Sequence, residues 1–241
     1  MWSTADSNPF STDSNGASAA RRTLLQQTHT SCPLERDDMF QKARLVLTKS
    51  ILIQRGIPAH LRRRAAEVYD DAFAKKLRTF LGTREQRIAI LEESFAADYA
   101  FVALSDGDLV GIDGFHAAHG QLLDIGFGAL HRHLGWMRAL WAAGVGSIFT
   151  RTPQPEQLLM DGIAVDARMR GQAVGSLLLD AITQHAHEQG FHAVALDVIN
   201  SNPDARRLYE RKGFHVVKTS EYGWLTARAG FTSSTSMIKP V

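Results

Sequence analysis

The last third of the chain has the most regular pattern of apolar and polar positions. Residues 157–165 (QLLMDGIAV) are mostly apolar and predict a strand. An amphipathic helix ending at Gly190 follows, with its apolar stripe at Val174, Leu177, Leu178, Ala181 and Ile182. Residues 192–199 (HAVALDVI) predict a second strand, and a crossover of this length makes the two strands parallel neighbours.

The chain before this unit begins with a predicted strand and two predicted helices. Residues 44–55 suit the strand, and Pro58 opens a helix that Gly82 ends. Thr83 and Gln86 form a capping box for the second helix.

A hairpin and a longer insert come next. Two apolar runs within residues 99–116 flank the turn sequence SDGD at 105–108, which predicts the hairpin. Residues 117–150 form an insert that we expect to be helical in part and to shape the acceptor side. Its large aromatic side chains include Phe127, Trp136, Trp141 and Phe149.

After the second central strand, Asn202 is expected to cap a helix that begins at Pro203 and ends at Gly213. Residues 214–219 (FHVVKT) and 232–240 (TSSTSMIKP) predict the closing strands. Strands that alternate with helices indicate an α/β fold whose sheet is covered by helices.

The composition adds a leader and excludes several classes of protein. Residues 1–40 are rich in Ser, Thr, Asp, Asn and Gly, so we expect a disordered leader before a single domain at 41–241. Met39 is an alternative start, which leaves open whether residues 1–38 are native. The net charge of +2 is too small for a nucleic-acid-binding surface. The single cysteine, Cys32, excludes a disulfide framework and favours the cytoplasm.

The most apolar segment, residues 139–150 (ALWAAGVGSIFT), is shorter than the ~18 apolar residues of a membrane span. It is interpreted as a core or substrate-facing segment, with a membrane-surface role as the alternative. Nor does the N-terminus carry the apolar stretch of a secretory signal.

The loop between the first central strand and its helix contains Arg168, Arg170, Gly171 and Gly175. A helix N-terminus carries partial positive charge and unpaired N–H groups, so such a loop suits a phosphate-bearing ligand. The alternative is an ordinary turn with solvated arginines. The nucleotide-binding patterns GxxxxGK[ST] and an early GxGxxG are absent from the sequence.

Residues 163–181 (IAVDARMRGQAVGSLLLDA) and 196–214 (LDVINSNPDARRLYERKGF) resemble the two signature blocks of the GNAT N-acetyltransferase superfamily. The first follows R/Q-x-x-G-x-G/A from Arg170 to Gly175, with Ala173 in place of the central glycine. A methyl group is tolerated there if residue 173 has helical dihedral angles. The second block carries Asn202, Ala205, Leu208, Tyr209, Gly213 and Phe214.

The resemblance implies a mixed, mostly antiparallel twisted sheet with a central, splayed pair of parallel strands and helices on both faces. It also implies that acetyl-CoA binds between the splayed strands as co-substrate, without a metal. The backbone of Ile163, Ala164 and Val165 would pair with the pantetheine arm. The cofactor-binding set would continue with Arg170, Gly171, Gln172, Ala173, Val174, Gly175 and Ser176 at the pyrophosphate, and with Asn202.

Acyl transfer to an amine needs a base, a polarised carbonyl and a stabilised leaving thiolate. The resemblance assigns the acid to Tyr209, for which a core tyrosine is the alternative. Asp197 is the predicted base, by resemblance to ribosomal-protein N-terminal acetyltransferases, and Asp161 is its rival. Both lie on apolar strands, where burial would raise the pKa of a carboxyl group. A structural carboxylate is the third interpretation.

Two other groups of residues have simpler interpretations. His185, His187 and His192 lack a carboxylate or cysteine at ligand spacing, which disfavours a metal site. The run 62–64 (RRR) is interpreted as a solvated face, with anion binding as the alternative.

The sequence therefore predicts direct acetyl transfer from acetyl-CoA to a primary amine of a small molecule or peptide. A non-catalytic acyl-CoA-binding regulatory module is the first alternative. Peptide or nucleic-acid binding through the arginine run is the second, which the nearly balanced charge disfavours. A homodimer is left open.

Overall fold

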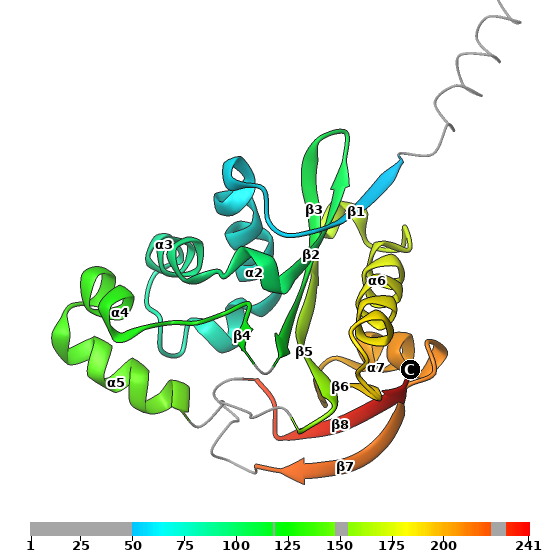
Figure 1. The fold of residues 1–241 in the computed structure, drawn as a ribbon. Helices are drawn as coiled ribbons and strands as arrows, with labels where there is room; N and C mark the ends of the chain where they lie inside the picture. The colour runs from blue at the N-terminus through cyan, green and yellow to red at the C-terminus, as the bar shows by residue number, and fades with distance from the viewer. Residues whose placement is uncertain (1–49, 118, 148–153, 223–229) are drawn as a thin grey trace, which may run out of the picture. The chain divides into compact units, whose positions relative to one another are not determined.

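An eight-stranded mixed sheet runs through the computed structural model, which describes residues 50–117, 119–147, 154–222 and 230–241 (Figure 1). The main path of the sheet has the order β1-β2-β3-β5-β6-β8-β7, and β4 pairs with β3. Neighbouring strands are antiparallel except β5 and β6, which are parallel. The predicted leader, Cys32 and Phe149 lie outside the described residues.

The N-terminal elements follow the predicted order. Their bounds are β1 Ile51–Arg55, a 3₁₀ turn at Ala59–Leu61, α2 Arg62–Leu77, α3 Arg84–Ser94, β2 Ala100–Ser105 and β3 Asp108–Ala117. The capping box of α3 is confirmed, because Gln86 N–H donates to the Thr83 hydroxyl and the Gln86 side chain accepts from Thr83 N–H. The first helix ends five residues before Gly82, earlier than predicted, and a turn fills the difference.

The predicted helical content of the insert is also confirmed. The insert comprises β4 Gly120–Gln121, α4 Phe127–Leu134 and α5 Trp136–Ser147. The C-terminal elements are β5 Gln157–Val165, a 3₁₀ turn at Ala167–Met169, α6 Val174–Glu188, β6 Ala193–Ile199, α7 Pro203–Arg211, β7 His215–Glu221 and β8 Ser233–Pro240. The last strand enters the sheet between β6 and β7.

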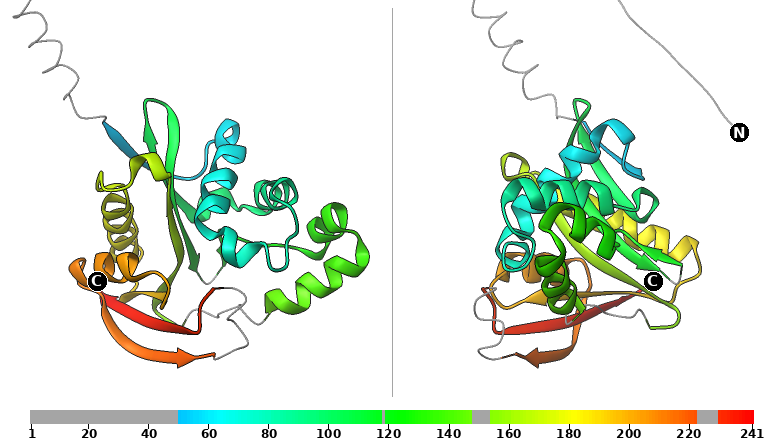
Figure 2. Two further views of the ribbon diagram at one scale, coloured as in Figure 1. Left: turned by 180° about the vertical axis from the view of Figure 1, so that it is seen from behind. Right: turned by 90° about the vertical axis from the view of Figure 1, so that its left-hand side faces the viewer.

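Helices cover both faces of the sheet, as the two further views show (Figure 2). One hydrophobic cluster packs α2 and α3 against β2 and β3, and a second packs α6 and α7 against β5 and β6. The helix α6 also lies very close to β3, because a Cβ atom at Gly111 on β3 would lie 2.9 Å from the Val174 side chain. The mixed α/β fold with a central parallel pair is thus confirmed.

A buried ion pair joins α2 to α3. Arg87 Nε and Nη2 donate to the two carboxylate oxygens of Asp70 at 2.6 and 2.9 Å, and Arg87 Nη1 donates to the carbonyl of Gly82. Asp70 is 1% exposed, so water cannot replace these bonds if one partner is removed.

We predict that Asp70→Ala lowers the free energy of unfolding by about 3–5 kcal/mol, because it leaves the Arg87 charge buried without its partner. Urea denaturation measures the loss. The matched control is Asp71→Ala, which removes an exposed pair with Arg84 and should cost less than about 1 kcal/mol. Equal losses in the two variants would show that the buried pair has no special role.

Candidate active site

The two central strands separate after a short parallel ladder. β5 and β6 pair only from Gln157 to Leu159, opposite Ala193 to Ala195. From Met160 to Val165, β5 continues its ladder with β3 alone. The backbone edge of β5 at 163–165, which the sequence predicted to pair with a pantetheine arm, therefore borders the opening between the strands.

A bulge in β5 lies just beyond the point of separation. Gly114 faces Gly162 and Phe115 faces Met160, so Asp161 is the extra residue. Gly162 has φ of +142°, and a Cβ atom there would lie 2.9 Å from the Phe73 ring. The bulge thus needs glycine at 162.

The loop from β5 to α6 leaves the start of α6 open. No side chain caps the helix, and its first backbone hydrogen bond runs from Leu177 N–H to the Ala173 carbonyl. The N–H groups of Val174, Gly175 and Ser176 precede this bond and lack acceptors within the helix. Residues 170–173 are exposed, and the space where a Cβ of Gly171 would lie contains no other atom within 4 Å. The loop fits a phosphate-bearing group.

Ala173 corrects one expectation from the sequence. It does not have helical dihedral angles, because its φ of +61° and ψ of +5° are left-handed. Glycine adopts this conformation without strain, whereas in alanine it costs about 1–2 kcal/mol of conformational energy. The glycine of the signature block is therefore a conformational requirement that this chain meets at a cost.

The arginines before the helix have different roles. Arg168 donates to the Asp166 carboxylate through its backbone N–H, Nε and Nη2, and Arg64 from α2 binds the same carboxylate. These bonds, those of Arg168 first, hold the pKa of Asp166 well below its usual range. Arg168 thus fixes the turn, while Arg170 is exposed at the open end of the loop.

The arginine run on α2 is not simply a solvated face. Arg62 donates to the carbonyls of Glu92 and Phe95 at 2.9 and 2.7 Å, and Arg63 pairs with Glu67 and Glu92. The third member, Arg64, binds Asp166 and so ties α2 to the turn between β5 and α6.

Near the bulge one carboxyl group, that of Asp113, is buried and a second, that of Asp161, is half-buried. Asp113 is 0% exposed, and within the described parts of the chain neither of its carboxyl oxygens has a hydrogen-bond partner; the same holds for Oδ2 of Asp161. Burial, and then the charge of Asp161, raise the pKa of Asp113 well above its usual range. Burial raises the pKa of Asp161 to about 6, although a backbone hydrogen bond from Leu122 and the charge of Lys76 oppose the shift.

Asp197 differs from Asp161 in its surroundings. It is exposed on β6 and accepts a hydrogen bond of 2.6 Å from the Ser236 hydroxyl on β8. The expectation of a carboxylate removed from water is therefore wrong for Asp197, whereas Asp161 is half-buried and its pKa is raised by that burial. Lys76, at the end of α2, interacts electrostatically with both groups, and burial lowers its pKa.

Tyr209 lies on α7, 6% exposed, with its ring 6.0 Å from that of Phe214. Burial, and then the charge of Asp113, raise the pKa of its phenol, so the hydroxyl keeps its proton at neutral pH. Leu208, on the same helix, packs against Gly175: a Cβ atom added at Gly175 would lie 3.3 Å from the Leu208 side chain. This contact places α7 against the start of α6. The Asn202 oxygen caps α7 by accepting from Ala205 N–H.

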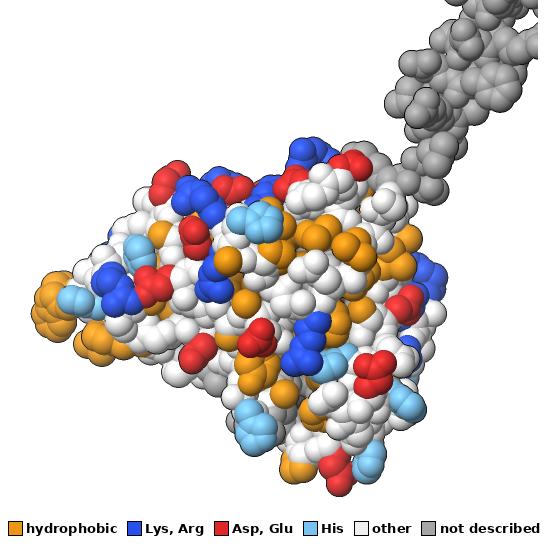
Figure 3. All heavy atoms as spheres, turned by 45° about the horizontal axis from the view of Figure 1, so that its top comes forward, with side chains coloured by type: hydrophobic (Ala, Val, Ile, Leu, Met, Phe, Trp, Pro, Cys, Tyr) orange, Lys and Arg blue, Asp and Glu red, His pale blue; other side chains and the backbone are white. Residues whose placement is uncertain are grey.

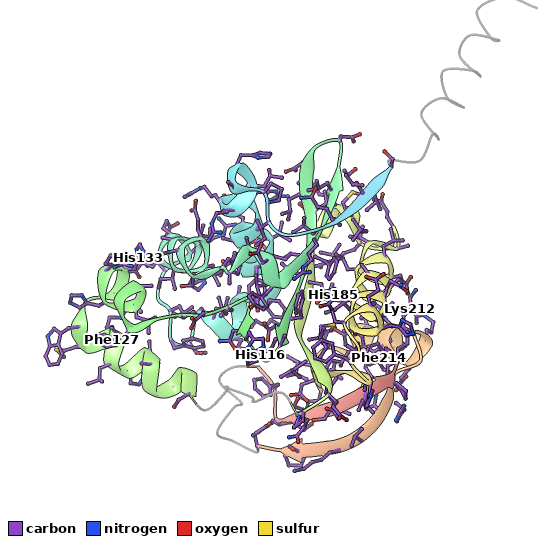
Figure 4. The ribbon with its side chains drawn as sticks, viewed as in Figure 1. His116, Phe127, His133, His185, Lys212 and Phe214 are labelled. Atoms are coloured by element: carbon purple, nitrogen blue, oxygen red, sulfur yellow. The ribbon has the colours of Figure 1, made fainter. Side chains whose placement is uncertain are left out.

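The histidines do not assemble a metal site among the described residues. His185 packs in the core against Phe101 and Phe115, at ring distances of 5.5 and 5.2 Å, as its place on the buried face of α6 predicted (Figure 4). His192 is exposed and lies 3.0 Å from Glu156.

Four residues near the site were missed by the sequence argument: Asp113, Lys76, Arg64 and Tyr69. Burial, and then the charges of Asp161 and Asp113, raise the pKa of the Tyr69 phenol. Asp113 had a detectable signal, because it is a charged residue within the apolar run at 109–115. The other three lie on α2, and only packing brings that helix to β5.

The comparisons with known proteins agree with this geometry. Residues 142–214 match the model of the acetyltransferase (GNAT) family. This part of the chain, which includes β5, α6, β6 and α7, is thus similar to that family. Two solved structures share the fold. One, an acetyltransferase, has a TM-score of 0.54 at 23% identity, over 79% of this chain and 99% of its own. A GCN5-related N-acetyltransferase from Kribbella flavida has a TM-score of 0.51 at 16% identity, over 79% and 98%.

Curated relatives match only in part. A mycothiol acetyltransferase from Propionibacterium freudenreichii is 39% identical over 66 residues, which are 27% of this chain and 21% of that protein. A probable N-acetyltransferase camello from Xenopus tropicalis is 31% identical over 81 residues, 33% of this chain and 37% of that protein. The chain thus spans well under half of either relative.

We predict that Ala173→Gly stabilises this domain by about 1 kcal/mol, because glycine relieves the left-handed strain at the start of α6. Thermal unfolding measures the gain. Ala72→Gly is the matched control: residue 72 is exposed within α2, where the same change should cost about 1 kcal/mol. Destabilisation of both variants would contradict the strain at 173.

Proposed function

We propose that the protein transfers an acetyl group from acetyl-CoA to a primary amine of a small molecule or peptide, in the cytoplasm. The observation that carries the proposal is the position of the half-buried carboxyl group of Asp161, whose Oδ2 is buried without a hydrogen-bond partner among the described residues, at the point where β5 and β6 separate. The uncapped start of α6 adds a fitting site for the diphosphate of coenzyme A.

The chain's own groups hold the co-substrate in this proposal. The amides of 174–176 and the side chain of Arg170 bind the diphosphate, and the edge of β5 at 163–165 binds the pantetheine arm. Acetyl-CoA supplies an activated thioester when bound, so the protein needs no nucleophile of its own. A backbone N–H of β5 polarises the carbonyl as negative charge develops on its oxygen.

We assign the base to Asp161 rather than to the Asp197 of the sequence argument. A base must be unprotonated near neutral pH yet strong enough to accept a proton from an ammonium group. Burial gives Asp161 a pKa of about 6, which meets both conditions. Tyr209 keeps its proton and donates it, or a hydrogen bond, to the departing sulfur.

The first test is calorimetry with acetyl-CoA. The full chain should bind it, and Arg170→Ala should weaken binding roughly tenfold, because a charged hydrogen bond to phosphate is lost. Arg211→Ala, an exposed arginine at the far end of α7, is the control and should bind normally. Absence of binding by the unaltered chain would refute the proposal.

The second test separates an enzyme from an acyl-CoA-binding module. Tyr209→Phe should lower turnover by about 100-fold while sparing acetyl-CoA affinity, measured by thiol release over a panel of amines and by calorimetry. Binding without turnover in the unaltered chain, across the whole panel, would favour the regulatory module.

The third test concerns the base. The unaltered protein should show kcat/KM rising with pH through about 6, since Asp161 must lose its proton to act. Asp161→Asn should remove this dependence and lower kcat by at least about 100-fold. Asp197→Asn should keep the pH dependence. If Asp197→Asn removed the pH dependence and Asp161→Asn kept it, the role of base would be assigned to Asp197.

Stability gives an independent readout of the same group. Because burial raises the folded-state pKa of Asp161 above its unfolded value, ionisation costs stability as the pH rises from about 4 through about 6. Asp161→Asn should therefore stabilise the protein by about 2–3 kcal/mol at pH 7.5 and much less at pH 4. Asp71→Asn is the control: this exposed residue of α2 should change the free energy of unfolding by less than about 1 kcal/mol at either pH.

A further inference from the structure

The outer face of the insert carries large apolar side chains in solvent. Trp136, Met137, Leu140 and Trp141 on α5 are 64%, 69%, 61% and 54% exposed, and Phe127 at the start of α4 is 51% exposed. We call these five residues the aromatic patch. Figure 3 shows hydrophobic side chains gathered at one end of the molecule, with basic, acidic and histidine side chains close by.

The arrangement of α5 is the reverse of an ordinary surface helix. Its buried positions are small, Ala139 and Ala142, while the large side chains recur at 136, 137, 140 and 141 and face outward. A surface helix normally points its large apolar stripe at the core and its polar residues at water. The exposed side of α5 is thus built to contact an apolar medium.

The patch does not line the proposed active site. Figure 4 places Phe127 at the outer end of α4, well away from His116 at the end of β3. Both tryptophans are strongly exposed, so their rings face solvent rather than an acceptor pocket. The expectation that the insert shapes the acceptor side therefore does not extend to these side chains.

The charge around the patch favours an anionic partner. Arg132 on α4 and Arg138 on α5 are exposed beside the patch, and residues 125–147 contain no acidic side chain. Glu93 on α3 pairs with Arg132 and His133 and balances part of this positive charge. We propose that the aromatic patch docks the protein on the surface of an anionic lipid bilayer. Tryptophan and phenylalanine would enter the headgroup region, and the arginines would lie among the lipid phosphates.

Two alternatives fit less well. Across a two-fold axis, a second copy would bring together the exposed Arg132 and Arg138 of both chains, which outnumber the Glu93 carboxylates beside them, so like charges would meet. A span is excluded for the described residues, since none of their helices is long and apolar enough to cross a membrane. With 12 residues, α5 instead has the character of a helix that lies in the interface.

Vesicle flotation of the full-length protein tests the proposal. It should float with phosphatidylcholine–phosphatidylglycerol vesicles, much less with phosphatidylcholine alone, and less as salt is added. Trp136→Ser combined with Trp141→Ser should weaken binding by about tenfold or more, because apolar contact area is lost. Both side chains are exposed, so thermal unfolding should show an intact fold.

Leu52→Ser combined with Val217→Ser is the matched control. These residues are 59% and 63% exposed on the outer strands β1 and β7, away from the insert, and the pair should bind vesicles normally. The proposal would be overturned by absence of flotation, or by equal binding of the tryptophan variant. A dimer that light scattering shows to dissociate in the tryptophan variant, without vesicle binding, would assign the patch to a second copy.

Discussion

The candidate site depends on one constraint, the loss of pairing between β5 and β6 after three residues. β5 keeps its ladder with β3, so the sheet remains continuous on that side while its backbone edge opens on the other. The bulge at Asp161 and Gly162 lies just past the separation. The end of pairing opens the backbone edge of β5. The bulge next to it places the Asp161 carboxyl group at that opening.

The start of α6 is held in place by packing on three sides. Gly111 lets Val174 approach β3, Gly175 lets Leu208 approach α6, and the salt bridge from Arg64 to Asp166 fixes the preceding turn. These contacts keep the helix end rigid without a side-chain cap, so its N–H groups remain available for a ligand. Ala173 has a strained left-handed backbone conformation, and this packing holds it there.

Carboxyl groups that are shielded from water behave in two ways in this protein. Asp70 is matched to Arg87 by two hydrogen bonds and contributes to the docking of α2 on α3. Asp113 is buried and Asp161 is half-buried without a matched arginine of this kind, and their pKa values rise instead. Pairing makes a carboxylate structural, whereas burial without pairing leaves it able to exchange a proton near neutral pH. The same residue type thus acquires different chemistry from its neighbours alone.

The sequence by itself determined the elements, because apolar periodicity and capping residues are local. The hairpin at 100–117, α6, α7 with its Asn202 cap, and the parallel relation of β5 to β6 could all be predicted. The open turn at 170–173 could be predicted as well, since glycines and a strand-to-helix junction mark it. Only the tertiary structure decided which carboxyl group is buried: Asp161 and Asp197 have similar apolar neighbours in sequence, but the bulge and α2 enclose one while the other remains exposed. The same holds for Arg64, for the left-handed Ala173 and for the outward face of α5, because burial and backbone conformation depend on residues distant along the chain.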